Sequence, residues 1–475
     1  MTNSQLTNES LPYTMHIDLN SCFAIIEQQA NRLLRGRPVG IAAYDTPRGF
    51  VLAASYEAKA KNIKLGVNVE QSRSLAPGIV IMTPDPAKYR EAHRLFKAVL
   101  LEYSPKVTPK SIDEFILDLS KSSILKDKVR EIRIKTSTTQ HSTIIPQSSQ
   151  ETERSLHNQA MLQIGTEIKK KIAERLGEWV TVNIGISTNR FLAKYAAGFD
   201  KPDGMTLIDH TNLRSKYENM QLVDLPGINT RFRARLRNSG IYTPLEFLDA
   251  DMQLLKKQVF KSINGYHWYM RLRGYEADAV EFSQKSIGHQ HALSDKTTDV
   301  DKLEKLLIKL CEKTGRRLRK GNYYASGIHL YLGFVREKSM SDSPIGFENM
   351  HELSSWHHGE KVQHRLYSTI DIYEAAKKLL LSAEIPRRVS IMSVHVFGLS
   401  PWNPEQLSIF DVESRQEDVR LDRHNYSSIT ARKRVTDAVD AINNRYGEFV
   451  ITPAMMLDMQ GTILDRIAFG QVRDL

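Results

Sequence analysis

Two short apolar runs in the first quarter of the chain carry carboxylates, and both have the alternation typical of strands. The run at 13–18 ends on Asp18, and the run at 111–118 is interrupted by Asp113 and Glu114. A desolvated carboxylate is costly unless it is paired, metal-bound or exposed. Neighbouring side chains of a regular strand point to opposite faces, so Asp113 and Glu114 can serve one site only at a turn or strand end. The pattern therefore predicts a break in the second strand.

Further elements are expected around these strands. Asn20 or Ser21 can cap a helix that runs through Phe23. Strands at 39–43 and 50–54 and a helix near 56–61 predict a small α/β unit ending near residue 84. Helices at 88–103 and around 161–176 flank the second carboxylate strand, and a third strand is expected at 181–186.

The segment 121–158 has the composition of an insertion. Its central part, 136–150, is rich in Ser, Thr and Gln and has few apolar anchors beyond Ile144 and Ile145. Such a segment cannot bury enough apolar surface to order itself, so we expect a mobile, non-catalytic insertion.

The stretch 209–277 has helical spacing and contains a turn at 225–229. Gly227 and Asn229 in that turn resemble the hairpin of a helix-hairpin-helix motif. Such a turn aims backbone N–H groups at a phosphate without reading bases. Asn229 stands where the motif has a second glycine, although asparagine tolerates a left-handed backbone.

Strands alternate with helices over 285–400, and this region has a positive balance of 18 Lys and Arg against 13 Asp and Glu. Arg316, Arg317, Arg319 and Lys320 cluster at the end of an expected helix. The cluster is either a contact for a polyanion or a solvated helix end that the macrodipole favours. Beyond Ser400 a tail is expected, with one helix around 432–446.

Composition narrows the possible partners. The formal charge of +11 over 475 residues suggests a polyanionic ligand. Cys22 and Cys311 are the only cysteines, so no disulfide framework is expected and a reducing cytosol fits. No stretch suggests a membrane span or a signal peptide, and we expect a cytoplasmic protein without membrane contact.

Five motifs occur in an order and at a spacing similar to those of Y-family translesion DNA polymerases. They are Asp18-Leu19-Asn20-Ser21-Cys22-Phe23-Ala24, Ala54-Ser55-Tyr56-Glu57-Ala58-Lys59, Ser111-Ile112-Asp113-Glu114, Gly185 to Lys194, and Lys201-Pro202-Asp203-Gly204. The chain most resembles the bacterial branch that includes DNA polymerase IV and the catalytic subunit of DNA polymerase V. The resemblance implies an α+β, multidomain right-hand polymerase with palm, fingers, helical thumb and little finger.

The resemblance also implies domain boundaries and an activity. The palm would comprise 13–22 and 85–208, the fingers 23–84, the thumb 209–278, the little finger 285–400 and the tail 401–475. The activity would be template-directed, low-fidelity translesion synthesis from deoxynucleotides on primer-template DNA, by a catalytic monomer associated with the nucleoid.

The family's catalytic chemistry assigns roles to the acidic motifs. Asp18 and Asp113 would bridge two Mg²⁺ ions, Glu114 would bind the ion that activates the primer hydroxyl, and the Leu19 carbonyl would complete the other ion's shell. Asn20 stands where many relatives have a second acid, so that position would not be an obligatory ligand.

Nucleotide contacts are implied for Tyr56, Lys59 and Lys201 at the triphosphate and for Phe23 at the sugar. The Phe23 ring would clash with a ribose 2′-hydroxyl, whereas without the family it is most simply core filling. Lys59 replaces the arginine of polymerase IV, so a point charge replaces a bidentate fork. Gly227, Asn229 and the basic cluster at 316–320 would contact the DNA backbone.

Gln406-Leu407-Ser408-Ile409-Phe410 resembles the peptide that docks bacterial polymerases on the sliding clamp. Gln406 would fill a polar subsite, with Leu407 and Phe410 as apolar anchors. An ordinary apolar tail turn would look the same.

Two other functions remain open at this point. The chain could be a non-catalytic Y-family accessory protein that binds DNA, although its intact carboxylates argue against this. It could also be a palm-domain nucleotide cyclase, which would need neither the Gly227 hairpin nor a clamp peptide.

Overall fold

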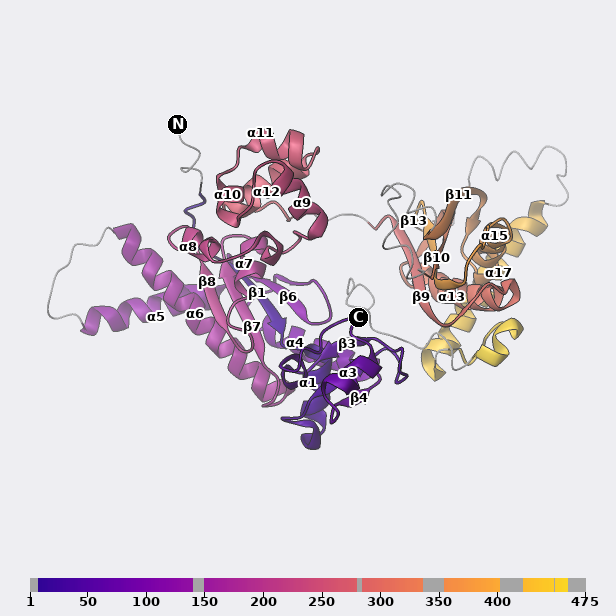
Figure 1. Cartoon of the computed structure of the whole chain (residues 1–475), viewed down its shortest axis with the longest axis horizontal. Helices are drawn as coiled ribbons and strands as arrows, with labels where there is room; N and C mark the ends of the chain where they lie inside the picture. The colour runs from indigo at the N-terminus through magenta and orange to yellow at the C-terminus, as the bar shows by residue number, and fades with distance from the viewer. Residues whose placement is uncertain are drawn as a thin grey trace. The chain divides into compact units, whose positions relative to one another are not determined.

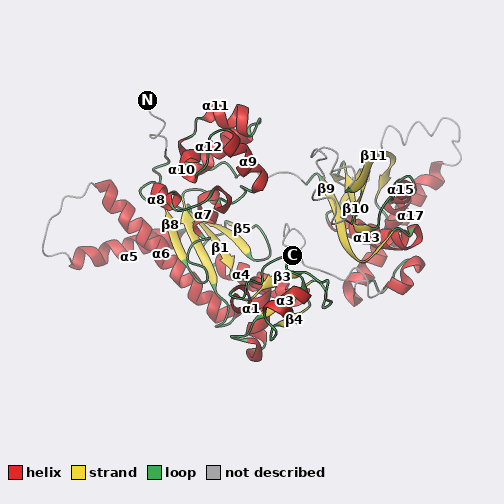
Figure 2. Ribbon diagram, in the orientation of Figure 1, coloured by secondary structure: helices red, strands yellow, loops and turns green. Residues whose placement is uncertain are grey.

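The computed structural model describes residues 7–139, 149–279, 284–335, 354–401, 422–447 and 449–459. The chain divides into two compact units, residues 1–280 with 466–475 and residues 281–465. We call them the first and second units (Figure 1). Helices and sheets are mixed in both, as Figure 2 shows by colour.

A five-stranded sheet forms the centre of the first unit. Its order is β5-β6-β1-β7-β8, and β1 pairs antiparallel with both β6 and β7. This register places Asp18 directly opposite Glu114 on one side and Asn183 on the other. The strands are β1 (Thr14–Leu19), β5 (Val107–Pro109), β6 (Glu114–Asp118), β7 (Val182–Ser187) and β8 (Met205–Ile208).

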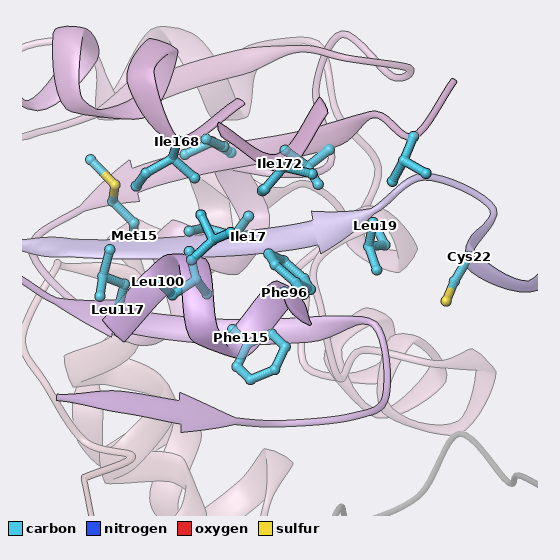
Figure 3. Close-up of a cluster of buried hydrophobic side chains, with 14 of the residues drawn as sticks. Met15, Ile17, Leu19, Cys22, Phe96, Leu100, Phe115, Leu117, Ile168 and Ile172 are labelled. Atoms are coloured by element: carbon cyan, nitrogen blue, oxygen red, sulfur yellow. The ribbon is translucent and has the colours of Figure 1, made fainter. Parts of the chain in front are cut away.

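Strand β1 alternates between a buried apolar face and a polar face. Met15, Ile17 and Leu19 are at most 2% exposed and belong to one core cluster. Figure 3 shows them beside side chains of α4 (Pro86–Leu101) and α6 (Ser149–Leu176), including Phe96 and Ile172. Because side chains alternate along a strand, His16 and Asp18 are directed to the other face of the sheet.

A smaller sheet, in the order β3-β2-β4, follows β1 in sequence. Ser55 caps the short helix after β3 by accepting a hydrogen bond from the backbone N–H of Ala58. This cap fixes the start of the turn that carries Tyr56 and Lys59. The elements are α1 (Cys22–Ala30), η2 (Arg32–Leu34), β2 (Val39–Ala42), β3 (Val51–Ala54), α2 (Tyr56–Lys59), α3 (Val69–Leu75) and β4 (Val80–Met82).

The described parts of the segment 121–158 are largely helical, whereas its composition predicts a mobile insertion. Helix α5 (Ser123–Thr139) has 17 residues and α6 already begins at Ser149, while the central residues 140–148 lie outside the described part of the chain. Leu125, Ile132 and Leu156 are buried in the central core, so a few well-spaced apolar residues are enough to anchor these helices. Composition was misleading here because it does not register which of the few apolar residues pack together in the core.

Helices dominate the remainder of the first unit and enclose a separate apolar core that contains Tyr217, Phe247 and Trp268. They are α7 (Arg190–Ala196), α8 (Leu213–Glu218), η3 (Leu222–Asp224), α9 (Thr230–Asn238), α10 (Pro244–Asp249), α11 (Met252–Leu254), the π-helical turn η4 (Leu255–Val259) and α12 (Asn264–Leu272).

The second unit is built on an antiparallel sheet in the order β11-β10-β12-β9. Apolar residues of its helices and of one sheet face form a single core. The elements are β9 (Ser286–Thr297), α13 (Val300–Lys320), β10 (Tyr323–Phe334), β11 (Ser355–Leu366), α15 (Thr369–Leu381), β12 (Val389–Phe397), β13 (Ser400–Pro401), α17 (Asp422–Tyr446) and η6 (Ala454–Met459).

Helix α17 is part of the second unit and is not a separate tail. Asp440 of α17 accepts two hydrogen bonds from the Arg319 guanidinium of α13, at 2.6 and 3.0 Å. Arg319 also donates to the Tyr367 carbonyl, and its side chain is 3% exposed. The expectation that Arg319 contacts DNA is therefore wrong for this arrangement, because its charge is used inside the unit.

None of the described helices combines the length and the apolarity needed to cross a membrane.

The Arg319–Asp440 pair generates a stability prediction. Replacing Asp440 by Ala leaves a buried guanidinium uncompensated, which typically costs about 3–5 kcal/mol. We expect Asp440→Ala to lower the free energy of unfolding of the second unit by that order in denaturant titrations of the full chain. Arg434→Ala, at an exposed position of the same helix, should change it by less than about 0.5 kcal/mol. Equal effects of the two variants would show that the pair does not hold α17.

Candidate active site

The acidic residues meet where β6 begins. Residues 111–113 form a bend, and Glu114 is the first residue of β6, so the required break in the strand is present. Asp113 lies in the bend, and its carbonyl accepts a hydrogen bond from the Leu19 N–H at 2.9 Å. Asp18 and Glu114 face each other across β1 and β6. Like charges opposite each other in a sheet repel, so this pairing requires nearby cations.

Two lysines supply those cations. Lys201 forms an ion pair with Asp18, and the Lys194 ammonium donates to both oxygens of Glu114 at 2.7 and 2.9 Å. Lys194 is the fifth residue of α7. It ends one of the five family motifs, but its partner Glu114 could not be predicted from the sequence, because this contact depends on how α7 packs. Lys201 was expected to contact a triphosphate, whereas in this structure it pairs with the Asp18 carboxylate.

The three carboxylates differ in their proton affinity. Burial, together with the charges of Asp18 and Glu114, raises the pKa of Asp113 to about 6. Burial also raises the pKa of Asp18, although Lys201 opposes this shift. Burial disfavours the ionised form of Glu114 too, but its neighbours His16 and Lys194 outweigh burial and lower its pKa. Asp113 is thus the carboxylate whose charge its surroundings disfavour most clearly.

His16 lies behind the carboxylates, and sequence analysis gave it no role. Its Nε2 atom is 3.8 Å from a Glu114 oxygen, and its side chain is 2% exposed. Burial lowers the pKa of His16 to about 4, so the imidazole is uncharged at neutral pH. The i, i+2 spacing to Asp18 on one strand face is the pattern that could have identified it.

The carboxylates fit a site for hard divalent cations. Three carboxylates converge at one sheet end, and such oxygens are the ligands that Mg²⁺ prefers. In the arrangement of the described residues, no group of three or more His, Cys, Asp or Glu side chains forms a ready metal site. The lysine pairing explains this, since Asp18 and Glu114 are directed to ammonium groups.

The residues expected at the triphosphate gather beside Asp18. The Lys59 ammonium donates to the Ser21 hydroxyl at 2.6 Å and lies 4.5 Å from the centre of the Tyr56 ring. Burial and the charge of Lys201 lower the pKa of Lys59. Burial and Asp18 raise the pKa of Tyr56 to about 12. Lys59 and Lys201 thus form a cationic side to the site.

Asn20 is held by hydrogen bonds and is 1% exposed. Its amide oxygen accepts from the Tyr56 hydroxyl at 3.3 Å, and its amide nitrogen donates to the Thr181 hydroxyl at 3.0 Å. A carboxylate at position 20 could not donate a hydrogen bond to Thr181. The amide of Asn20 is therefore suited to a structural role, because it both donates and accepts.

Comparison with known proteins identifies this arrangement. Residues 17–198 match the model of the impB/mucB/samB family, and residues 284–409 match the model of that family's C-terminal domain. A DNA polymerase IV of Moorella thermoacetica is 31% identical over 454 residues, covering 94% of this chain and 96% of that protein. The chain belongs to the Y-family of DNA polymerases. It is accordingly a DNA-directed DNA polymerase.

Other relatives agree with this assignment. A DNA polymerase IV of Pelotomaculum thermopropionicum is 26% identical and covers 94% of this chain and 96% of its own length. A solved Y-family DNA polymerase chimera has a TM-score of 0.64 at 21% identity, covering 82% of this chain and 99% of that one. The expected α+β multidomain polymerase fold is therefore confirmed.

In this Y-family polymerase the turn at 225–229, which resembles a helix-hairpin-helix, is preceded by only a short 3₁₀ turn. Gly227 has a φ of +92°, which favours glycine, and it is exposed. The element before it, η3, is a three-residue turn of 3₁₀ helix instead of a full helix. Asn229 is extended, with a φ of −112°, and accepts a hydrogen bond from the Thr230 N–H. It therefore caps α9 and does not take the left-handed conformation that we considered.

Helix α9 carries four arginines that sequence analysis missed, at 231, 233, 235 and 237. Arg231, Arg235 and Arg237 are exposed directly after the hairpin. The alternation of arginine over seven residues, next to a suspected phosphate turn, was the pattern that could have identified them.

The basic cluster on α13 is mostly engaged within the second unit. Arg316 donates to the Asn444 side chain at 2.8 Å, and Arg317 donates to the Gly288 carbonyl at 2.9 Å. Lys320 is exposed at the helix end. The clamp peptide residues Gln406, Leu407 and Phe410 lie outside the described residues.

Phe23 is fully buried, and its ring stacks on Tyr89 with centroids 4.3 Å apart. Phe23 therefore fills the core in this structure, as its sequence position without the family suggested, and its ring has no exposed area that could contact a sugar. It nevertheless lies two residues from Ser21, which binds Lys59.

A substitution of Phe23 can distinguish a role in the core from a role in recognising the sugar. If the ring also borders the bound sugar, Phe23→Leu should raise ribonucleotide over deoxynucleotide insertion at least about tenfold, since a lost clash exceeds about 1.4 kcal/mol. Single-nucleotide insertion kinetics measure this ratio. The control is Phe96→Leu, also fully buried in the same core, which should be destabilised with its ratio unchanged. An unchanged ratio in Phe23→Leu would leave only the core role.

Proposed function

We propose that this chain carries out template-directed, low-fidelity translesion synthesis by two-metal nucleotidyl transfer. The observation that carries the proposal is the register of Asp18 opposite Glu114, with Asp113 at the strand break. In a Y-family polymerase this end of the palm sheet is where a primer end and a deoxynucleotide would meet.

Asp18, Asp113, Glu114 and the Leu19 carbonyl would hold two Mg²⁺ ions. When bound, these ions would lower the pKa of the attacking hydroxyl and stabilise charge on the reacting phosphate. Asp113, with its pKa of about 6, is mostly ionised at neutral pH and would gain most from an added cation.

The lysines would exchange partners when substrate binds. Lys201 and Lys194 balance Asp18 and Glu114 in the structure. Once divalent ions balance those carboxylates, Lys201 would be released to the triphosphate beside Lys59 and Tyr56. A lysine suits this exchange because its ammonium is a compact charge on a flexible stem.

DNA binding is proposed for the exposed arginines of α9, the Gly227 hairpin and Lys320. Backbone contacts of this kind are sequence-independent and weaken with salt. A bacterial sliding clamp is proposed as partner of Gln406 to Phe410, which would raise the effective concentration of enzyme at the primer end. A catalytic monomer and a cytoplasmic, nucleoid-associated location complete the proposal.

The second candidate function is a DNA-binding accessory protein without catalysis. The three intact carboxylates and their paired lysines argue against it, because a non-catalytic protein gains nothing from burying mutually repelling acids.

Substitution of the carboxylates distinguishes the two functions. Asp18→Asn, Asp113→Asn and Glu114→Gln should each lower primer extension by at least about a hundredfold, since each removes a ligand for charge stabilisation worth several kcal/mol. Primer-template affinity should stay within about threefold of wild type. The matched control is Asp118→Asn, at the other end of β6 and paired with Lys106 at 2.9 Å, which should extend normally. Normal extension by all three site variants would refute the proposed mechanism.

A further inference from the structure

Three histidines lie together on one face of the sheet in the second unit. His329 of β10 pairs directly with His395 of β12, and their ring centroids are 6.5 Å apart. His357 of β11 is one step along, with its centroid 5.6 Å from that of His329. We call His329, His357 and His395 the histidine row.

The row lies on the face opposite the helices. His329 alternates with the buried Ile328 and Leu330, and His395 alternates with the buried Val394 and Val396. Those neighbours belong to the core that the helices complete. The histidines therefore face away from α13 and α15, with His357 exposed and the other two half-buried.

Two glycines make room for the imidazoles. The cross-strand sequence through the row is Gly359, His329, His395, Gly288. A Cβ at Gly288 would lie 2.2 Å from His395 Nδ1, and a Cβ at Gly359 would lie 2.9 Å from His329 Cδ2. Each ring thus leans over a glycine toward an outer strand, which spreads the two imidazoles apart across the sheet.

No carboxylate faces the row among its described neighbours, and Tyr331, on the same face of β10, has its ring centroid 6.5 Å from that of His357. On β11, Lys361 lies in the next row and His358 is adjacent, while Glu360 pairs with buried Ile328 and points to the other face. β9 contributes Gly288 and Gln290, and β12 contributes Ser393. Behind the sheet, Lys313 and Arg317 act on His289.

The three imidazoles have no hydrogen-bond partner within the described part of the chain. Burial and the neighbouring histidines lower the pKa of His329, and burial lowers the pKa of His395. His329 and His395 are therefore uncharged at neutral pH, and no described carboxylate faces them to hold a proton.

We propose that the histidine row is a proton-dependent contact for backbone phosphates of the nucleic acid, so that the second unit grips DNA more tightly as pH falls. The inference rests on the proposed function for the identity of the polyanion. Imidazolium groups donate from both nitrogens and suit phosphate oxygens, whereas neutral imidazoles leave the face with little charge.

The direction and size of the effect follow from linkage. A bound phosphate favours the charged imidazole, so the contact is present below the pKa of the complex and lost as pH rises through it. If phosphate raises each pKa by about one unit, each histidine strengthens binding up to about tenfold on the acidic side.

The test measures primer-template binding by fluorescence anisotropy from pH 8 to pH 5.5 at constant ionic strength. Wild type should tighten by about tenfold or more over this range. The double variant His329→Gln with His395→Gln should have the wild-type affinity at pH 8. Between pH 8 and pH 5.5 its affinity should rise by a factor at least about threefold smaller than that of wild type. His329→Lys should bind more tightly at pH 8 and respond less to pH, which a merely structural role would not produce.

The matched control is His358→Gln, at the next position of β11 and paired with Leu330 on the other face. It should keep the wild-type pH response. An unchanged response in the double variant, or no tightening in His329→Lys at pH 8, would overturn the inference. Primer extension at pH 8 separates this failure from that of the proposed function, because the double Gln variant, which should bind DNA like wild type at that pH, should also extend at the wild-type rate.

Discussion

Repulsion among half-buried carboxylates is the constraint on which the first unit depends. Asp18 and Glu114 face each other across two antiparallel strands, and Asp113 adjoins them at the bend. Desolvation makes each of these charges costly, and their proximity adds to that cost. The site is tolerable because Lys201 and Lys194 reach it from segments that follow β7, so the fold must bring three distant parts of the chain together. The apolar face of β1 provides the rigid support for this assembly.

Much of this architecture could be predicted from the sequence. The break between Asp113 and Glu114 followed from strand alternation alone, and the resemblance of five motifs indicated the family. The contacts of Lys194 and His16 with Glu114 could not be predicted, because they form only when α7 and β6 pack against β1. Composition was misleading for 121–158, where helices α5 and α6 occupy much of a polar segment. The basic cluster was misleading for Arg319, whose charge is neutralised by Asp440, 121 residues later.

The second unit shows how one sheet can have two different faces. Its helix side is a closed apolar core, and α17 is joined to α13 there by the hydrogen bonds of Arg316 and Arg319. Its other side carries the histidine row over paired glycines. The arginines on the helix side carry a permanent positive charge, whereas the charge of the histidine row depends on pH.

The most direct test of the central claim is a carbon-13 NMR titration of carboxyl-labelled aspartates in the full chain, with Asp113 assigned by comparison with Asp113→Asn. Without divalent ions, Asp113 should titrate near pH 6, because burial and adjacent carboxylates disfavour its charge. Saturating Mg²⁺ with a deoxynucleotide should move this pKa well below its ordinary value. An Asp113 pKa that is ordinary without the ions, or that does not respond to them, would contradict a site built to gather uncompensated negative charge for metal binding.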